Sequence, residues 1–171
     1  AIKSSTPSAC RDKIKEAIKI IMTGTQDDLI AFIDKFRAEF KTLPLSEISF
    51  PRTANGLENW KGVSSIYIKG TPMHVKAALA YNHFLTEHNL QNDYELIRSG
   101  EKIKFIAIQE PNVFGVGVMG FMTRIPKELA LDSRVDYKVQ FEKSFIDPLR
   151  IILDSIGWKT EKVSTLDKFF G

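Results

Sequence analysis

Cysteine is almost absent from this sequence, since the 171 residues include only Cys10. A single cysteine excludes an internal disulfide framework and a zinc site built from several cysteines. No apolar run approaches the ~18 residues that indicate a membrane-spanning helix. The N-terminal segment carries charges throughout, unlike a secretory signal. Because the chain begins at Ala1 rather than at a methionine, we expect a fragment or a processed product.

Net charge is small as well. The sequence has 24 Lys and Arg residues against 21 Asp and Glu residues, a formal charge of +3. This excess allows a polyanionic partner only if the basic residues cluster on one surface. A hydrophobic content of 43% and a charged content of 26% are typical of a globular protein. The length is sufficient to bury a core without metal or disulfides, so we expect one domain, or one domain with a small subdomain.

The first 40 residues have the pattern of two amphipathic helices. The Thr6-Pro7 pair predicts the first start, with threonine as the cap and proline in the first helical position. Its apolar stripe ends near Gly24. Thr25 or Gln26 begins the second helix, whose stripe reaches Phe40. The short link favours an antiparallel helical hairpin.

Proline and glycine punctuate the next segment, 41–70, and short extended runs at Ile48–Phe50 and Ile66–Ile68 fit between them. Thr71-Pro72 then repeats the signal of a capping threonine and a proline. The apolar stripe that follows predicts a third helix, which reaches about His88.

Two later apolar runs, Ile103–Gln109 and Val113–Phe121, predict a β-hairpin. The segment Arg134–Trp158 predicts strand or helix before Lys143, and then a helix that Pro148 starts or kinks. Taken together, these elements predict an α+β, helix-dominated fold.

Neither a cofactor motif nor a metal set is persuasive. Gly115–Gly120 matches the dinucleotide fingerprint G-x-G-x-x-G, which works only where a strand turns directly into a helix. Ile125-Pro126 follows too soon for that helix, so we favour a glycine-rich strand. His83 and His88 lie five residues apart and do not share a helical face, and no further ligand completes a set with them or with His74. We expect no cofactor in this chain.

The C-terminal peptide carries an apolar cluster on a polar tail. One tight helical turn would bring Leu166, Phe169 and Phe170 onto one side. Such residues cannot bury themselves within the tail. They therefore either dock back on the domain or enter a pocket of another protein.

Basic, amide and aromatic residues gather in the middle of the chain. They are Arg52, Asn55, Asn59, Trp60, Lys61, Lys69, His74 and Lys76, and Lys102, Lys104 and Lys143 could extend the surface. Such side chains suit contacts with phosphate and sugar, which need hydrogen-bond donors but no base code. The alternative is an ordinary solvated face.

Five segments occur in an order that resembles one known family. They are Lys3–Pro7, Lys69–Asn82, Gly100–Lys102, Asn112–Gly115 and Glu142–Leu149. With the hydrophobic tail, they resemble the C-terminal thumb region of the family B replicative DNA polymerases of T-even-type bacteriophages. The resemblance extends from Lys3 to Phe170.

This resemblance implies a thumb-like domain at residues 1–158, with a helical base (1–42 and 134–158) and a β-containing tip (about 43–133). It also implies a flexible clamp-binding tail at residues 159–171, in which Leu166, Phe169 and Phe170 fill the pocket of a sliding clamp.

The domain would grip primer–template duplex DNA, mostly through backbone phosphates near the minor groove. The residues that the resemblance places on the duplex are Asn55, Trp60, Lys69, Lys76, Lys102 and Lys143. Lys69, Lys102 and Lys143 would pair with phosphates, whereas Asn55 and Trp60 would lie on a loop that follows the strand. The family has a lysine where this chain has Asp147, so that phosphate contact is not carried over.

Nucleotidyl transfer needs paired carboxylates that hold two metal ions and a nucleotide-binding helix. Neither the palm aspartate motif nor the finger motif of the family occurs in the sequence. We therefore expect this chain to be non-catalytic alone, as part of a split polymerase or as an excised domain. The expected partners are duplex DNA, the sliding clamp and a separate catalytic part that holds Mg²⁺, with no membrane, in the cytoplasm of the host cell. The alternative is a non-enzymatic adaptor that uses the apolar tail.

Overall fold

Two antiparallel helices open the structure, a computed structural model that describes residues 2–162. They are α1 (Ser8–Thr23) and α2 (Gln26–Phe40), and they confirm the predicted hairpin. Thr25 caps α2 in a capping box: its hydroxyl accepts the N–H of Asp28 at 3.2 Å, and the Asp28 carboxylate accepts the N–H of Thr25 at 2.9 Å. Two of the N–H groups that every helix start leaves unpaired are thereby satisfied.

The predicted threonine caps of α1 and of α5 (Met73–Glu87) are wrong. In each case the proline itself, Pro7 or Pro72, is the N-cap, with extended ψ angles of 144° and 150°. The Thr6 hydroxyl accepts the N–H of Lys3, and the Thr71 hydroxyl donates to the carbonyl of Ile68. Both threonines therefore close the turn that precedes the helix instead of capping it.

The C-terminal helix is continuous from residue 137 to residue 156. It consists of α6 (Tyr137–Phe141), a π-helical turn η3 (Glu142–Ile146) and α7 (Asp147–Ile156). Proline has no N–H and crowds the carbonyl one turn earlier, so a wide turn placed before Pro148 accommodates it. The structure resolves the open choice between strand and helix before Lys143 in favour of helix.

This long helix packs against the α1–α2 hairpin through buried aromatic rings. The ring centroids of Phe36 and Phe145 are 4.9 Å apart, and those of Phe40 and Phe141 are 5.1 Å apart. All four rings are at most 1% exposed. Such pairs stabilise a core by about 0.5–1.5 kcal/mol each beyond the burial of their area. We call α1, α2, α6, η3 and α7 the helical lobe.

The remaining elements form a sheet lobe. Its antiparallel sheet has the order β1 (Phe50–Ala54), β2 (Glu101–Ala107) and β3 (Val118–Phe121). Pairing of β2 with β3 confirms the predicted hairpin, and β1 adds a third strand from much earlier in the chain. A single helical turn, α3 (Leu45–Ile48), precedes β1, so of the expected extended run Ile48–Phe50 only Ser49 and Phe50 are extended.

Helix α5 lies across this sheet, and one glycine permits the close approach. A Cβ atom at Gly120 would lie 3.0 Å from the carbonyl carbon and oxygen of Ala77. Any side chain at position 120 would therefore force α5 away from β3. The short helices of the lobe are α4 (Leu57–Trp60), η1 (Lys127–Leu129) and η2 (Leu131–Ser133).

Two long connections in the sheet lobe have little regular structure. The expected extended run at Ile66–Ile68 forms only an isolated bridge, between Lys61 and Tyr67. After α5 the chain is held by Asn82, whose amide group donates to the carbonyl of Ile97 at 2.8 Å and accepts the Ile97 N–H at 2.7 Å. The second connection is therefore fixed although it has no helix or strand.

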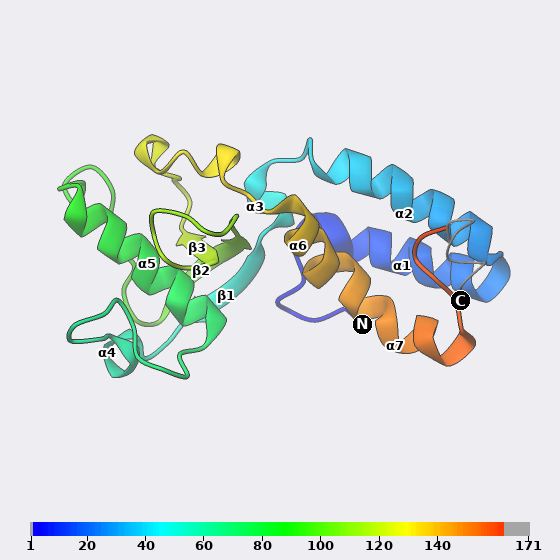
Figure 1. Cartoon of the computed structure of the whole chain (residues 1–171), viewed down its shortest axis with the longest axis horizontal. Coiled ribbons are helices and arrows are strands. Elements are labelled where there is room, and N and C mark those ends of the chain that lie inside the picture. The colour runs from blue at the N-terminus through cyan, green and yellow to red at the C-terminus, as the bar shows by residue number, and fades with distance from the viewer. Residues whose placement is uncertain (1, 163–171) are drawn as a thin grey trace.

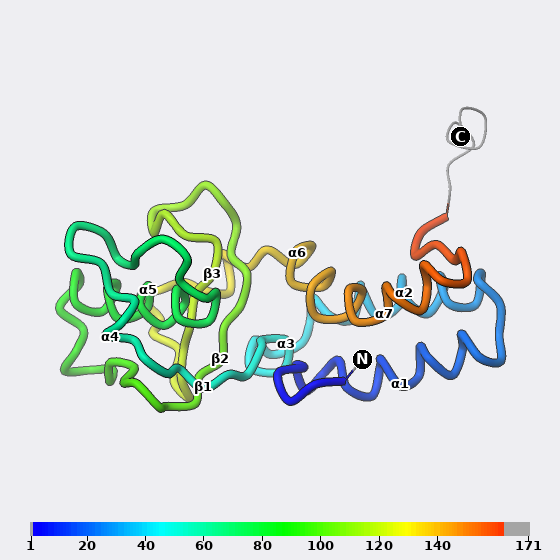
Figure 2. The backbone as a smooth tube through the Cα atoms, turned by 90° about the horizontal axis from the view of Figure 1, so that it is seen from below, coloured from blue at the N-terminus to red at the C-terminus, as the bar shows by residue number. Residues whose placement is uncertain are grey.

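The two lobes lie end to end along the longest axis of the molecule (Figure 1). Seen from below, the chain passes between them at α3 and again just before α6 (Figure 2). Gln140, which is fully buried, joins them there: its side chain accepts the N–H of Ala107 at 2.9 Å and donates to the carbonyl of Ile48 at 2.6 Å.

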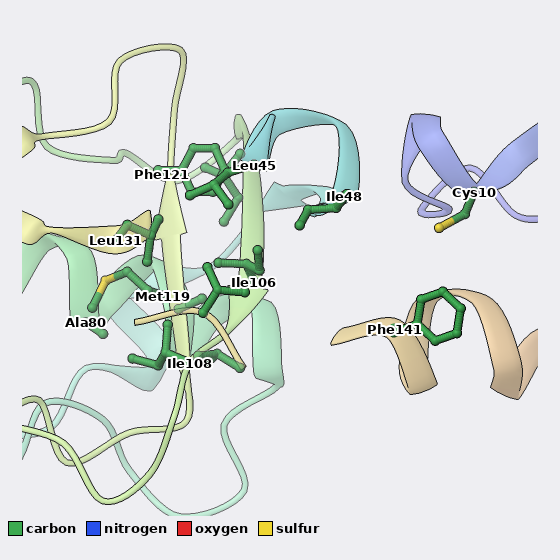
Figure 3. Packing of buried hydrophobic residues seen from close by; sticks show 14 of the residues in the cluster. Cys10, Leu45, Ile48, Ala80, Ile106, Ile108, Met119, Phe121, Leu131 and Phe141 are labelled. Carbon is green, nitrogen blue, oxygen red and sulfur yellow. The ribbon is translucent and has the colours of Figure 1, made fainter. Parts of the chain in front are cut away.

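The buried hydrophobic residues of both lobes form one cluster. Figure 3 shows Cys10 of α1 facing Phe141 of α6 in the helical lobe, with residues such as Ile106 and Phe121 in the sheet lobe. The α+β, helix-dominated fold class is confirmed. Among the described residues, no helix is both long enough and apolar enough to cross a membrane.

Candidate nucleic-acid interface

Four of the six residues predicted to bind DNA lie in one stretch of the sheet lobe, between β1 and the first turns of α5. Asn55 is exposed in the turn after β1, and Trp60 ends α4 with its ring partly buried against the core. The loop that follows folds back on α4, because the N–H of Ile68 donates to the carbonyl of Trp60 at 3.0 Å.

The two lysines of this stretch differ in their surroundings. Lys69 is exposed in the turn before α5, next to Gly70, whose φ of +86° favours glycine. The Lys76 ammonium lies 5.2 Å from the centroid of the Tyr67 ring, a cation–π contact that ties α5 to the loop. Lys69 therefore presents the freer charge of the two.

A histidine and an arginine add to this surface. His74 lies in the first turn of α5, and its ring centroid is 6.5 Å from that of Phe105 on β2. Partial burial and, secondly, the positive charge of Arg52 lower the pKa of His74 below its ordinary value. The imidazole is therefore neutral near pH 7 and contributes hydrogen bonding rather than charge.

Lys102 lies apart from this group, at the start of β2. It pairs with Thr53 across the sheet, and both are exposed, whereas its neighbour Ile103 is buried. Because side chains alternate along a strand, Lys102 points to the face of the sheet opposite Ile103. Lys104, two residues on, donates to the carbonyl of Ser46 at 2.8 Å, so its ammonium is already engaged.

Lys143 belongs to the helical lobe. It is exposed on η3 and lines a cavity of about 380 Å³ together with Lys3, Phe50 and Pro148. The structure thus places Asn55, Trp60, Lys69 and Lys76 in one segment of the sheet lobe, between β1 and the first turns of α5. It leaves Lys102 and Lys143 at two other places, and the predicted role of all six on DNA stays a prediction.

The clamp-binding residues Leu166, Phe169 and Phe170 lie outside the described residues. The chain just before them is anchored, because the Lys159 N–H donates to the Gln26 side chain at 2.7 Å and Trp158 packs on the core. Where the predicted domain ends and the predicted tail begins also stays a prediction.

The glycine triplet does not have the setting of a dinucleotide site. Gly115 lies in a turn, with φ of +68°, and Gly117 and Gly120 lead into and through β3. No helix begins directly after β3, where the next helical element is the short η1, so the glycines do not lead from a strand into a helix as the fingerprint requires. Within residues 2–162, no group of three or more His, Cys, Asp or Glu side chains could hold a metal ion.

Sequence reasoning missed two features. Gln140, at the lobe junction, is a polar residue in an apolar helical pattern, and that pattern break was the only available signal. The second is a cavity that joins Tyr81 of α5 with Lys102 and Arg124. Those residues are far apart in the sequence, and nothing in the pattern connects them.

Over nearly its whole length the chain is similar to DNA-directed DNA polymerases of bacteriophages, and it spans about 19% of their length. It is 27% identical to the DNA-directed DNA polymerase of Enterobacteria phage T4 over 178 aligned residues, covering 99% of the chain. It is 28% identical to the DNA-directed DNA polymerase of Escherichia phage RB69 over 173 aligned residues, covering 98% of the chain. No protein-family model matches. The predicted resemblance is confirmed, and a match of this extent is consistent with a C-terminal region.

Proposed function

We propose that this chain is the thumb part of a phage-type, family B DNA-directed DNA polymerase and that it holds primer–template duplex DNA by its phosphates. The observation that supports this proposal is the share of each protein that the match covers. The match takes in 98–99% of the chain but only 19% of each polymerase, so the chain is similar throughout to one part of a larger DNA-directed DNA polymerase.

The lysines on the surface support a phosphate-binding role. Lys69, Lys102 and Lys143 are exposed, and none of the three makes an ion pair or a side-chain hydrogen bond within residues 2–162. Two of them belong to the sheet lobe and one to the helical lobe. A duplex that contacted all three would therefore extend along both lobes and would be held without regard to sequence.

Catalysis would belong to a separate part of the polymerase. That part would hold the Mg²⁺ ions of nucleotidyl transfer through paired carboxylates. The tail, with Leu166, Phe169 and Phe170, would bind the sliding clamp. The complex would act in the cytoplasm of the infected cell. If the polymerase is naturally split, the coding sequence upstream should contain palm and finger motifs and end before Lys3.

The DNA proposal is tested by the salt dependence of duplex binding. Each phosphate that a cation neutralises contributes about −0.9 to the slope of log K against log salt. Four to six contacts would give a slope of roughly −4 to −5. Replacing Lys69 and Lys102 together by alanine should weaken binding to all sequences alike and reduce the slope by about 2.

The matched control is the double variant Lys15→Ala and Lys19→Ala, which removes two exposed lysines from α1. Its slope should stay closer to that of the parent chain. Equal slopes for the parent and the Lys69/Lys102 variant would show that these two lysines do not contact phosphates.

The clamp proposal is tested by deleting residues 165–171. Clamp binding should disappear, while duplex affinity and the unfolding temperature should stay the same. A marked fall in the unfolding temperature would instead show that the tail stabilises the domain itself.

A further inference from the structure

A cavity of about 590 Å³ lies in the sheet lobe, at the start of β2 and just beyond the end of β3. Its lining includes Tyr81 from α5, Tyr94 from the connection after α5, Lys102 from β2, and Thr123 and Arg124 from beyond β3. The volume is within the range of small-ligand pockets, about 300–1,000 Å³. It adjoins the predicted DNA surface, because Lys102 belongs to both.

Tyr81 presents an unpaired hydroxyl to this cavity. The residue is 1% exposed, and its hydroxyl makes no hydrogen bond with any of residues 2–162. Yet no side-chain nitrogen or oxygen of these residues is both shut off from solvent and unpaired. The small exposed part of Tyr81 is therefore its hydroxyl, which solvent reaches through the cavity that Tyr81 lines. A hydroxyl in this position can donate to, and accept from, a ligand.

Arg124 supplies a flat surface that its neighbours hold in place. Its guanidinium carbon lies 4.8 Å from the centroid of the Tyr94 ring, and its Nη1 donates to the carbonyl of Asp93 at 3.2 Å. The Tyr94 hydroxyl in turn donates to the Glu128 carboxylate at 3.3 Å. The ring of Tyr94 and the carbonyl of Asp93 thus hold the guanidinium, and Arg124 is exposed, so its plane can take part in stacking.

The charges around the cavity indicate what kind of group it accepts. Three carboxylates line it, those of Asp93, Glu95 and Glu101, against the two cations Lys102 and Arg124. This balance disfavours a free anion. It suits an uncharged planar group that has both donors and acceptors on its edge and is attached to a phosphate near Lys102.

We propose that this cavity receives one nucleobase from a single-stranded part of the DNA, stacked on Arg124 and hydrogen-bonded to the Tyr81 hydroxyl, with Lys102 at its phosphate. Unpaired bases stack on arginine planes and aromatic rings in many single-strand binding proteins. The proposal rests on the proposed function, since it needs Lys102 on the DNA backbone. It adds a single-strand subsite to a surface otherwise assigned to duplex.

The test uses the full chain and a primer–template whose single-stranded template carries one 2-aminopurine, a base whose emission changes when it stacks. A fully duplex DNA of equal length measures the duplex surface separately. The variants are Arg124→Lys, which keeps the charge but loses the plane, and Tyr81→Phe, which loses only the hydroxyl. Arg98→Lys is the matched control, because Arg98 is an exposed arginine of the same lobe that does not line the cavity.

We expect the 2-aminopurine emission to change when the parent chain and Arg98→Lys bind. Arg124→Lys should lose this change and bind the single-stranded template at least about fivefold more weakly, the fold-change for loss of one base stack. Tyr81→Phe should reduce the affinity to a lesser extent, and duplex affinity should be equal in all four proteins. An unchanged emission with the parent chain, or equal behaviour of Arg124→Lys and Arg98→Lys, overturns the proposal while duplex binding stands. Loss of duplex binding by the parent chain overturns the proposed function as well.

Discussion

Replacing Gln140 by methionine should destabilise the protein far more than a surface glutamine-to-methionine change. The two side chains have similar length, so the change leaves the packing nearly the same and removes the polar atoms. Two buried backbone groups, the N–H of Ala107 and the carbonyl of Ile48, then lose their partners. Leaving a buried polar group unpaired costs about 1–3 kcal/mol. Because two such groups are left unpaired, we expect the free energy of unfolding to fall by about 2–6 kcal/mol.

For a chain of this size, each kcal/mol corresponds to about 2–4 °C in the unfolding temperature. Calorimetry should thus show a decrease of about 4–24 °C for Gln140→Met. The control is Gln91→Met at an exposed position, for which the change should be within about 0.5 kcal/mol. If Gln140→Met matched that control, the two hydrogen bonds across the lobe junction would not stabilise the fold, and the reasoning would be wrong.

Three further predictions concern stability and reactivity. Gly120→Ala places a methyl group 3.0 Å from the Ala77 backbone and should cost about 1–3 kcal/mol in urea unfolding; no change would mean that α5 can move away freely. Ala130→Gly should stabilise the protein by up to about 1 kcal/mol in the same assay, because Ala130 has a left-handed φ of +48°, and destabilisation would contradict this. Burial raises the pKa of Cys10 to about 11 from 9.0, despite a hydrogen bond with Ser144 that lowers it. The folded state thus favours the neutral thiol, so this contribution to stability is complete below pH 9 and is lost between about pH 9 and 11. A thiol reagent at pH 8 should react with Cys10 only as the protein unfolds, and rapid reaction of the folded chain would refute this burial.

Local patterns made the long helices and the hairpin predictable. The apolar stripes of α1 and α2 bury one face each, whereas α5 is buried on all sides at Ala77–Tyr81. Strands β2 and β3 are consecutive in the sequence. The capping of α1 and α5 was not predictable in the same way. The hydroxyl of a threonine before a proline can form a hydrogen bond with the first turn of the helix or with the turn that precedes it. Here both threonine hydroxyls bond to the preceding turn.

Features that depend on distant residues could not be read from the pattern. Strand β1 pairs with β2, and the two strands are separated in the sequence by the whole of α5. The helical segment before Lys143 is short, and only Gln140 and Phe141 are buried in α6, so its apolar pattern did not separate helix from strand. For the candidate site, the sequence supplied the residue types. The surface on which each residue lies depends on strand alternation and on the way α5 crosses the sheet. The separation of Lys102 from Lys76 is one example.

The helical lobe is continuous in space but interrupted in the sequence by the whole sheet lobe, and this arrangement imposes an order of events during synthesis. Among these elements, α1 and α2 leave the ribosome before α5 and the strands of the sheet. The aromatic residues of α6 and η3 follow after the sheet lobe. Until Phe141 and Phe145 emerge, Phe36 and Phe40 have only each other's rings to pack against. The nascent hairpin therefore exposes an apolar face that invites association with other chains or with chaperones. A chain that ends before residue 137 should therefore contain all strands of the sheet lobe but an incomplete helical lobe, whose exposed apolar face makes the product prone to aggregation.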